Sequence, residues 1–408
     1  MADDLGTEVT DRVDAMQPAP NEGAADIAER ARRVAFIAAQ HAEEVDREGR
    51  FPTEAIAAAK QEGLMGLLAP SALGGADASH GDIVEVCFIL GQACASTAMI
   101  YAMHSVKVAC VVRHRQDSAW HEAFVRRLTA QQLLLASSTT EGQAGGNVRS
   151  SAAPVVYADG RIQLNRDASV ISYGESADGL VTTARRAADA AASDQVLLVL
   201  EKADYTLAPT QTWETLGMRG TASRGFALKA DADQVQILPQ PYARIHAETM
   251  TPSAHLFWSA AWAGVAAGAV ERARRFVRKA ARNADGQMPP AAAYVSKAMV
   301  SLRALRALLA TMTGRYDALK DNREALAALE FQNAITLLKV DVSELAVETV
   351  MSALRACGLS GYRNDNESSL GRHLRDILSA PIMINNERIL ANLSATSLVA
   401  ELPQTIRN

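Results

Sequence analysis

The amino-acid sequence predicts an α+β protein in which a β-rich middle part separates two helical parts. Two changes in hydrophobic periodicity are the basis for this prediction. Apolar residues recur at helical spacing up to about residue 130, and again from about residue 247. Between these points, short apolar runs alternate with Gly, Asp and Ser, which is typical of strands and turns. We therefore predict four segments: a flexible leader (1–23), an N-terminal helical domain (24–130), a central β domain (131–246) and a C-terminal helical bundle (247–408).

The N-terminal part is predicted to form several amphipathic helices. Ala31, Val34 and Ala38 share one face of the first helix, with charged residues between them. Pro52 stands at an early position of the second helix, where its missing N–H is tolerated. Further helices are predicted over residues 81–94 and around residues 101–104.

The middle part is predicted to form a compact sandwich or barrel. Strands are expected over residues 155–157, 162–164, 168–172, 179–183, 195–200 and 235–239. The short, even spacing of these runs argues against βαβ units, which need a helix between successive strands.

The C-terminal part is predicted to form a bundle of long helices. The helical pattern covers residues 253–283, 292–319, 323–357 and 384–399. A bundle with such long apolar seams often carries an oligomer interface, so we predict a homo-oligomer, either a tetramer or a dimer.

The amino-acid composition argues against several classes of binding partner. Hydrophobic residues make up 49% and charged residues 21% of the chain, and the formal net charge is -5 without a long basic run. These values disfavour nucleic acid and anionic membranes as partners. The four cysteines show no metal-ligand spacing, so we predict no metal site and a cytoplasmic protein with reduced thiols. The most apolar run, residues 256–270, is too short to span a membrane.

Three motifs resemble the acyl-CoA dehydrogenase superfamily. Residues 216–223 (LGMRGTAS) are similar to a signature in that family's β domain, and residues 357–362 (CGLSGY) to its glycine-rich turn. Arg375-Asp376 resembles the Arg-Asp pair that follows this turn. The resemblance covers residues 24–399 and implies an N-terminal helical domain, a central β-barrel or sandwich, a C-terminal four-helix bundle and a flavin cofactor.

The resemblance also implies flavin-facing residues. Residues 139–146 resemble a loop that places Thr139 and Thr140 beside the flavin pyrimidine ring. Residues 170–173 resemble a strand that places Ser172 beside flavin N5. Without the resemblance, Thr140 and Ser172 are equally well explained as caps of strand ends. The other cofactor-binding positions that the resemblance implies are Gly145, Gly146, Ile171, Arg282, Arg355, Gly358 and Asn386.

Several of these positions depart from the family pattern. Gly146 replaces a serine, Arg355 replaces a glutamine that contacts the adenine, and Arg282 is the nearest base to an incomplete pyrophosphate motif. These departures imply that FAD is bound more weakly or in a different way. Alternatively, the protein uses reduced flavin, either FAD or FMN, that a partner protein delivers.

The catalytic base of the dehydrogenases is absent from its expected positions. Counted from Arg375-Asp376, the resemblance places this glutamate at Ile384, and the alternative position used by some relatives falls at Ala254. Neither side chain accepts a proton. Glu387 lies nearly one helical turn beyond Ile384 and is the candidate for a relocated base.

A branch of two-component flavin monooxygenases fits these departures better. The resemblance to this branch implies His104 as a proton-transfer residue and Ser172 as a donor near flavin C4a and N5. The branch often has a further histidine in the C-terminal segment, where this chain has only Asn385 and Asn386, so the match is partial and Asn385 is the candidate for a further catalytic residue. Judged from its own helix, His104 can equally be a core histidine, and Asn385 or Asn386 can be a helix cap. The implied partners are O₂ and a separate flavin reductase.

The substrate pocket is predicted at the start of the long helix. His255, Trp258 and Trp262 would line it, and two tryptophans on one helix face suit a flat substrate. A tryptophan in a bundle seam is also often a core residue.

Three functions therefore remain open. The first is a monooxygenase that hydroxylates a small aromatic or heterocyclic substrate. The second is an acyl-CoA dehydrogenase that uses Glu387 as its base, and the third is a non-catalytic flavin-binding scaffold.

Overall fold

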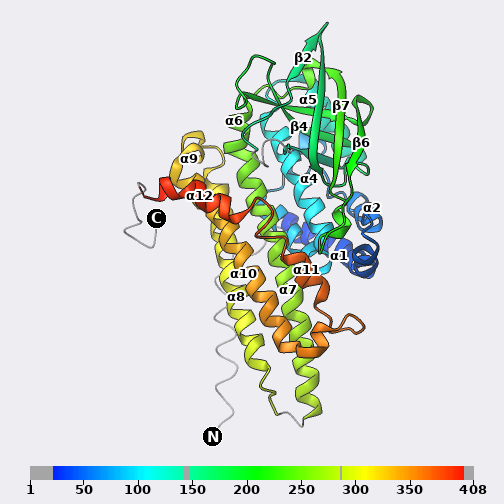
Figure 1. The fold of residues 1–408 in the computed structure, drawn as a ribbon, viewed down its shortest axis with the longest axis vertical. Helices are drawn as coiled ribbons and strands as arrows, with labels where there is room; N and C mark the ends of the chain where they lie inside the picture. Colours follow the sequence, from blue (N-terminus) through cyan, green and yellow to red (C-terminus); the bar gives the residue numbers. More distant parts are fainter. Residues whose placement is uncertain (1–21, 142–147, 285–286, 399–408) are drawn as a thin grey trace.

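The computed structural model describes residues 22–141, 148–284 and 287–398. Helices come first along the chain, a β part follows, and long helices form the other end of the molecule (Figure 1). The β part lies at one end, and the N-terminal helices pack beside the long C-terminal helices (Figure 1). The predicted α+β organisation is therefore confirmed.

From residue 22 onward, five α-helices build the N-terminal part. Their bounds are α1 (Glu22–Glu48), α2 (Thr53–Gln61), α3 (His80–Ala93), α4 (Ala95–His114) and α5 (Ala119–Gln131). A reciprocal capping box starts α3, because the Ser79 side chain accepts from Asp82 N–H while the Asp82 carboxylate accepts from Ser79 N–H. This pairing satisfies two backbone donors that the first turn leaves without partners.

Helix α4 runs through the centre of the molecule. It is long and apolar enough to cross a membrane, but 89% of its most apolar 18-residue stretch is buried inside the protein. It packs against α3, α7 and β1, and thereby contacts all three parts of the chain. We conclude that α4 is a core helix.

The β part consists of two sheets among the described residues. The first has the order β1-β4-β5, and the second is antiparallel with the order β2-β3-β7-β6. The strands are β1 (Leu135–Ser138), β2 (Val155–Ala158), β3 (Arg161–Ile171), β4 (Gly179–Arg185), β5 (Gln195–Glu201), β6 (Tyr205–Gln211) and β7 (Arg224–Asp233). Strand β5 is almost entirely buried, whereas β3 and β7 alternate between buried and exposed residues. The two sheets therefore enclose an apolar layer, as in a sandwich.

Three details of the strand prediction were wrong. The two short strands predicted over 162–172 form the single strand β3, and β1, β6 and β7 were not predicted. Residues 235–239 form a 3₁₀ turn and one isolated bridge, Leu198 with Ile237, in place of the predicted strand. The pattern of β7 was missed because Ala occupies many of its positions, and Ala has little strand preference.

Three long helices form the frame of the C-terminal part. They are α7 (Thr251–Asn283), α8 (Ala292–Leu319) and α10 (Leu329–Tyr362), with the short α6 (Tyr242–Ile245), α9 (Arg323–Ala327) and α11 (Gly371–Ile377) at their ends. The predicted helix over 323–357 is broken at Ala328, whose ψ of 139° is extended. Helix α10 kinks at Gly358, where a φ of 55° favours glycine. The last helix, α12 (Asn386–Ser397), lies across the upper end of this bundle (Figure 1).

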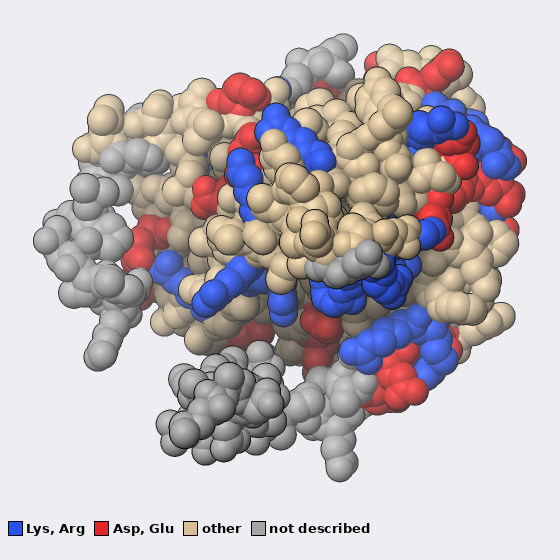
Figure 2. All heavy atoms as spheres, turned by 90° about the horizontal axis from the view of Figure 1, so that it is seen from below, with Lys and Arg blue, Asp and Glu red and all other residues tan. Residues whose placement is uncertain are grey.

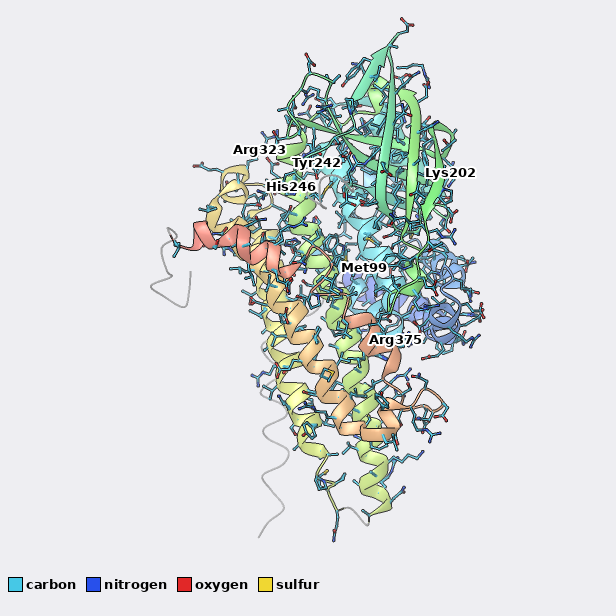
Figure 3. The ribbon with its side chains drawn as sticks, viewed as in Figure 1. Met99, Lys202, Tyr242, His246, Arg323 and Arg375 are labelled. Carbon is cyan, nitrogen blue, oxygen red and sulfur yellow. The ribbon has the colours of Figure 1, made fainter. Side chains whose placement is uncertain are left out.

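The Arg375-Asp376 pair joins the three parts of the chain. Arg375 Nη2 and Nη1 lie 2.5 Å and 3.1 Å from the two carboxylate oxygens of Asp46 on α1. Asp376 Oδ1 accepts a hydrogen bond of 2.7 Å from Met218 N in the β part. Gly217 is needed there, because a Cβ would lie 2.2 Å from the Arg375 carbonyl oxygen. Figure 3 shows Arg375 where α11 meets the N-terminal helices.

Replacing Asp376 with alanine should destabilise the protein. The substitution leaves the buried Met218 N–H without a partner, which costs about 1–3 kcal/mol in the free energy of unfolding. Urea unfolding measures this change. Asp365→Ala, which removes an exposed ion pair with Arg363, is the matched control and should change the free energy by less than about 0.5 kcal/mol. Equal effects of the two substitutions would contradict this role for Asp376.

Candidate active site

A cavity of about 1000 Å³ lies where the three parts of the chain meet. Its walls come from α4, from the ends of β1 and β3, from the π-helix at His246–Met250, and from α7, α10 and α12. This volume is at the upper end of the range of about 300–1,000 Å³ that is usual for small-molecule sites. The cavity is therefore large enough to hold a cofactor together with a small substrate.

The β wall carries the hydroxyl residues that the sequence placed near the flavin. Thr139 and Thr140 follow the end of β1, and Ser172 follows β3 directly, and all three line the cavity. They reach the same wall because β1 and β3 pack against each other. Hydroxyl groups at such a wall can donate to or accept from the polar edge of a heterocycle.

Ser172 is held in place by the segment that carries the LGMRGTAS motif. Its Oγ lies 2.8 Å from Ser223 Oγ, which in turn lies 2.7 Å from Thr221 Oγ1. Thr221 donates to the Met218 carbonyl at 2.8 Å, so the three hydroxyls form a chain that ends on the backbone. The motif thus fixes the orientation of Ser172 from behind the cavity wall.

Two of the three predicted pocket residues line the helical wall. His255 and the half-buried Trp258 face the cavity from α7. His255 Nδ1 lies 2.9 Å from the Ile335 carbonyl oxygen, and since a carbonyl can only accept, Nδ1 carries the proton. Burial lowers the pKa of His255 to about 4, so the ring is neutral at pH 7 and Nε2 remains an acceptor.

Trp262 does not line the cavity. Its side chain is buried in the core, and the ammonium of Lys339 lies 5.7 Å from the centre of its ring. This position matches the alternative of a core tryptophan.

The two positions at which a dehydrogenase base was expected both face the cavity without a carboxylate. Ala254 lies on α7, and Ile384, with a φ of 47°, lies just before α12. Glu387 is exposed on α12 and is not part of the cavity wall. Among the described residues that line the cavity, none is Asp or Glu. This wall therefore offers no carboxylate for removing a proton from a substrate.

His104 does not lie on the cavity wall either. Its Nδ1 accepts from Leu135 N at 3.0 Å, so Nε2 carries the proton and donates to the Met65 carbonyl at 2.8 Å. Burial lowers the pKa of His104 to about 4. Both ring nitrogens are thus used to join α4 to β1 and to the loop at Met65, which is the role of a core histidine.

The two asparagines before α12 have structural roles. Asn385 is exposed, and its Oδ1 accepts from Arg388 N at 3.1 Å, as a helix cap does. Asn386 is buried, accepts from Lys339 Nζ at 2.6 Å and donates to Glu344 Oε1 at 2.7 Å. These contacts attach α12 to α10, and neither asparagine lines the cavity.

Four of the remaining flavin positions implied by the resemblance are not among the residues that line this cavity. Ile171 is fully buried in β3, and the exposed Arg355 lies over the ring of Tyr294 at 5.9 Å. Gly358 forms the kink in α10. Arg282 is exposed in the last turn of α7, about 36 Å along the helix from Trp258. Gly145 and Gly146 lie outside the described residues.

Four basic residues of the cavity wall were not predicted. They are Lys107, Arg149, His246 and Arg388. Arg149 and Arg388 are exposed, so they lie at the rim, whereas Lys107 is only 4% exposed. His246 sits in a π-helix, a structure that is frequent at functional sites, at the junction of the helices with the β part (Figure 3). The sequence did contain one signal, because Lys107 interrupts an otherwise apolar helical run.

Lys107 is a buried cation without an anionic partner among the described residues. The hydrogen bond of its Nζ is a weak one, 3.7 Å from Met250 Sδ. Burial lowers its pKa to about 8. Figure 2 shows the end of the molecule seen from below, where Lys and Arg side chains also gather. The positive lining of the cavity suits an anionic ligand.

An α–β–α chain with such a cavity at the junction of its parts belongs to the class of flavin-dependent oxidoreductases. Residues 21–131 match the family model of the acyl-CoA dehydrogenase N-terminal domain, and residues 253–398 match that of the C-terminal domain. Together these matches cover more than half of the chain, so it belongs to the acyl-CoA dehydrogenase family.

Individual relatives include two kinds of enzyme. Cyclohex-1-ene-1-carbonyl-CoA dehydrogenase from Geobacter metallireducens is 24% identical over 88% of this chain and 93% of its own length. A probable FMNH2-dependent monooxygenase, SfnC from Pseudomonas putida, is 24% identical over 74% of this chain and 76% of its own length. The fold is similar to that of FMN-bound TdsC from Paenibacillus, with a TM-score of 0.80 and 19% identity over 92% of this chain and 98% of that chain.

Replacing His104 with alanine should lower stability. We expect a loss of about 2–4 kcal/mol in the free energy of unfolding, because the change creates a void and leaves two buried backbone groups unpaired. Urea unfolding tests this, with His41→Ala on the surface of α1 as the control that changes stability by less than about 0.5 kcal/mol. If the folded variant kept full stability and lost only activity, His104 would be a catalytic residue.

Replacing Lys107 with methionine should raise stability. The pKa of Lys107 is about 8 in the folded protein against an ordinary value of 10.5, so the unfolded chain holds its proton more tightly. At pH 7 the substitution should therefore add about 1–3 kcal/mol to the free energy of unfolding. This gain should shrink as the pH rises from 8 to 10.5, because the wild-type protein becomes more stable there. Urea unfolding at several pH values measures it, and a loss of stability at pH 7 would contradict the prediction.

Proposed function

We propose that this chain is the oxygenase component of a two-component flavin monooxygenase. It would use reduced flavin, FMN or FAD, and O₂ to hydroxylate a small aromatic or heterocyclic substrate. One observation carries the proposal: the hydroxyl residues that the resemblance assigns to the flavin line the cavity, while both base positions, Ala254 and Ile384, are apolar. Flavin chemistry that needs no carboxylate base is compatible with this wall, whereas α-proton removal from a thioester is not.

The described residues fit a flavin in two ways. Thr139, Thr140 and Ser172 offer hydroxyl groups to the polar edge of the ring system, and the exposed Arg149 and Arg388 offer positive charge at the rim to the flavin phosphate. When bound and reduced, the flavin supplies the electrons that activate O₂.

The helical wall would bind the substrate. Trp258 provides an aromatic face for a flat ring, and Nε2 of the neutral His255 accepts a proton or a hydrogen bond from the substrate. Ser172, oriented by Ser223, is the residue we assign to hydrogen bonding near flavin N5. The apolar side chains of Ile384 and Met103 help to exclude water from the space between these groups.

The relatives support this proposal in two respects. SfnC is named as FMNH2-dependent, which is consistent with a flavin that a separate reductase delivers. TdsC is a dibenzothiophene monooxygenase, and its structure has been solved with FMN and indole, a flat heterocycle. We further propose a homo-oligomer, a dimer or a tetramer, in the cytoplasm.

An acyl-CoA dehydrogenase is the second candidate, and the similarity to the Geobacter enzyme over 88% of this chain favours it. Glu387 would have to serve as its base, but this residue is exposed and outside the cavity wall. A non-catalytic scaffold would not require a cavity lined by oriented polar groups, so we place it last.

Oxygen consumption and product analysis test the proposed function. The purified chain, supplied with enzymatically reduced FMN, air and indole, should form a product that is heavier by one oxygen atom. Ser172→Ala should lower the yield of this product by about ten- to a hundredfold, while Ser176→Ala, an exposed serine near the same strand end, should leave it unchanged. Mass spectrometry and an oxygen electrode provide the measurements.

A different result would support the dehydrogenase. This outcome would be the bleaching of bound FAD by an acyl-CoA in the absence of oxygen, together with its loss in Glu387→Gln. In that case the monooxygenase proposal is wrong.

A further inference from the structure

The ammonium group of Lys107 is buried in a position that disfavours its charge. It lines the cavity from the core helix α4 and is 4% exposed, with the sulfur of Met250 as the hydrogen-bond partner of its Nζ at 3.7 Å. A buried ammonium without a carboxylate costs several kcal/mol, because a thioether replaces only a small part of its hydration. Such a cost in the wall of a cavity indicates that a ligand supplies the missing negative charge.

The positive charges of the cavity are divided between two places. Arg149 and Arg388 are exposed at the rim, where the phosphate of a flavin can reach them from solvent. Lys107 lies on the inner wall, between the side chains of Met103 and Val106 and those of the π-helix at His246–Met250. A flavin whose ring edge contacts Thr140 and whose phosphate lies at the rim would leave Lys107 to a second molecule.

The residues around Lys107 indicate the chemistry of this second molecule. Met103, Val106 and Trp258 line the same cavity with apolar and aromatic surface, which suits a flat ring. None of the described lining residues is acidic, so nothing in this wall competes with the ligand for the ammonium. A ring that carries one acidic oxygen group satisfies both requirements.

We propose that Lys107 binds the acidic group of the substrate, and that the substrate is a small aromatic acid, either a carboxylate or an ionised phenol. The proposal rests on the proposed function, since it assigns the inner wall to the substrate and the rim to the flavin. It makes Lys107 the specificity-determining residue of the cavity.

Binding of benzoate and benzamide tests this assignment. The two molecules have nearly the same shape, and only benzoate is charged. Isothermal titration of the full chain, with FMN bound or, if FMN does not bind, without it, should show benzoate binding at least about tenfold more tightly than benzamide. Lys107→Met should remove this preference, and Lys107→Arg should retain part of it.

Lys229→Met is the matched control. Lys229 is exposed on β7, away from the cavity, so the variant should keep the preference for benzoate. Thermal unfolding of each variant confirms that the protein used in the titration is folded.

Three results would overturn the proposal. The first is equal binding of benzoate and benzamide, or no binding of either at millimolar concentration. The second is an unchanged preference in Lys107→Met. The third is weaker binding of FMN, but not of the phosphate-free lumiflavin, in Lys107→Met, which would assign Lys107 to the flavin phosphate.

The outcome is separable from that of the proposed function. Formation of the oxygenated product reports on the monooxygenase, whereas the titration reports on ligand binding alone, so the two results are independent. If this activity is absent while Lys107→Met still removes the preference for benzoate, the cavity binds an aromatic acid for another reaction. If the activity is present and no preference exists, only the assignment of Lys107 is wrong.

Discussion

The arrangement of the whole molecule depends on the ion pair between Arg375 and Asp46 and on the neighbouring bond from Met218 to Asp376. These contacts join α11 to α1 and to the β part within two consecutive residues. The walls of the cavity come from the same three parts. Its geometry is therefore a property of the packing between parts, and no single part contains it. Burial raises the pKa of Asp376 to about 6, because the carboxylate loses most of its contact with water.

The segment with the LGMRGTAS sequence serves two purposes at once. Met218 anchors it to Asp376, and Thr221 and Ser223 continue from the same turn to orient Ser172 at the cavity wall. A shift between the β part and the helices would therefore change the position of this hydroxyl as well. Short motifs of this kind can persist because a substitution in them affects both the fold and the site.

Much of the fold followed from the sequence, because hydrophobic periodicity reports which faces are buried. Periodicity did not identify the site residues. The resemblance to the acyl-CoA dehydrogenase superfamily singled out Thr140, Ser172 and Ala254, and all three line the cavity. It failed for His104, whose partners Met65 and Leu135 lie 39 and 31 residues away and could not be read from its own helix. Lys107 was missed for a related reason: a cation in an apolar run signals function only when its surroundings in three dimensions are known.

The attachment of α12 through Asn386 has a consequence for how this protein can change over evolutionary time. The buried amide of Asn386 bonds to Lys339 and Glu344 on α10, and Arg388 and Ile389 in the same first turn of α12 line the cavity. The hydroxyl wall is built separately, from the β part. Substitutions along α12 can thus change which substrates fit the cavity, while the contacts of Asn386 keep the helix in place. The family can diversify in specificity there without altering the wall that we assign to the flavin.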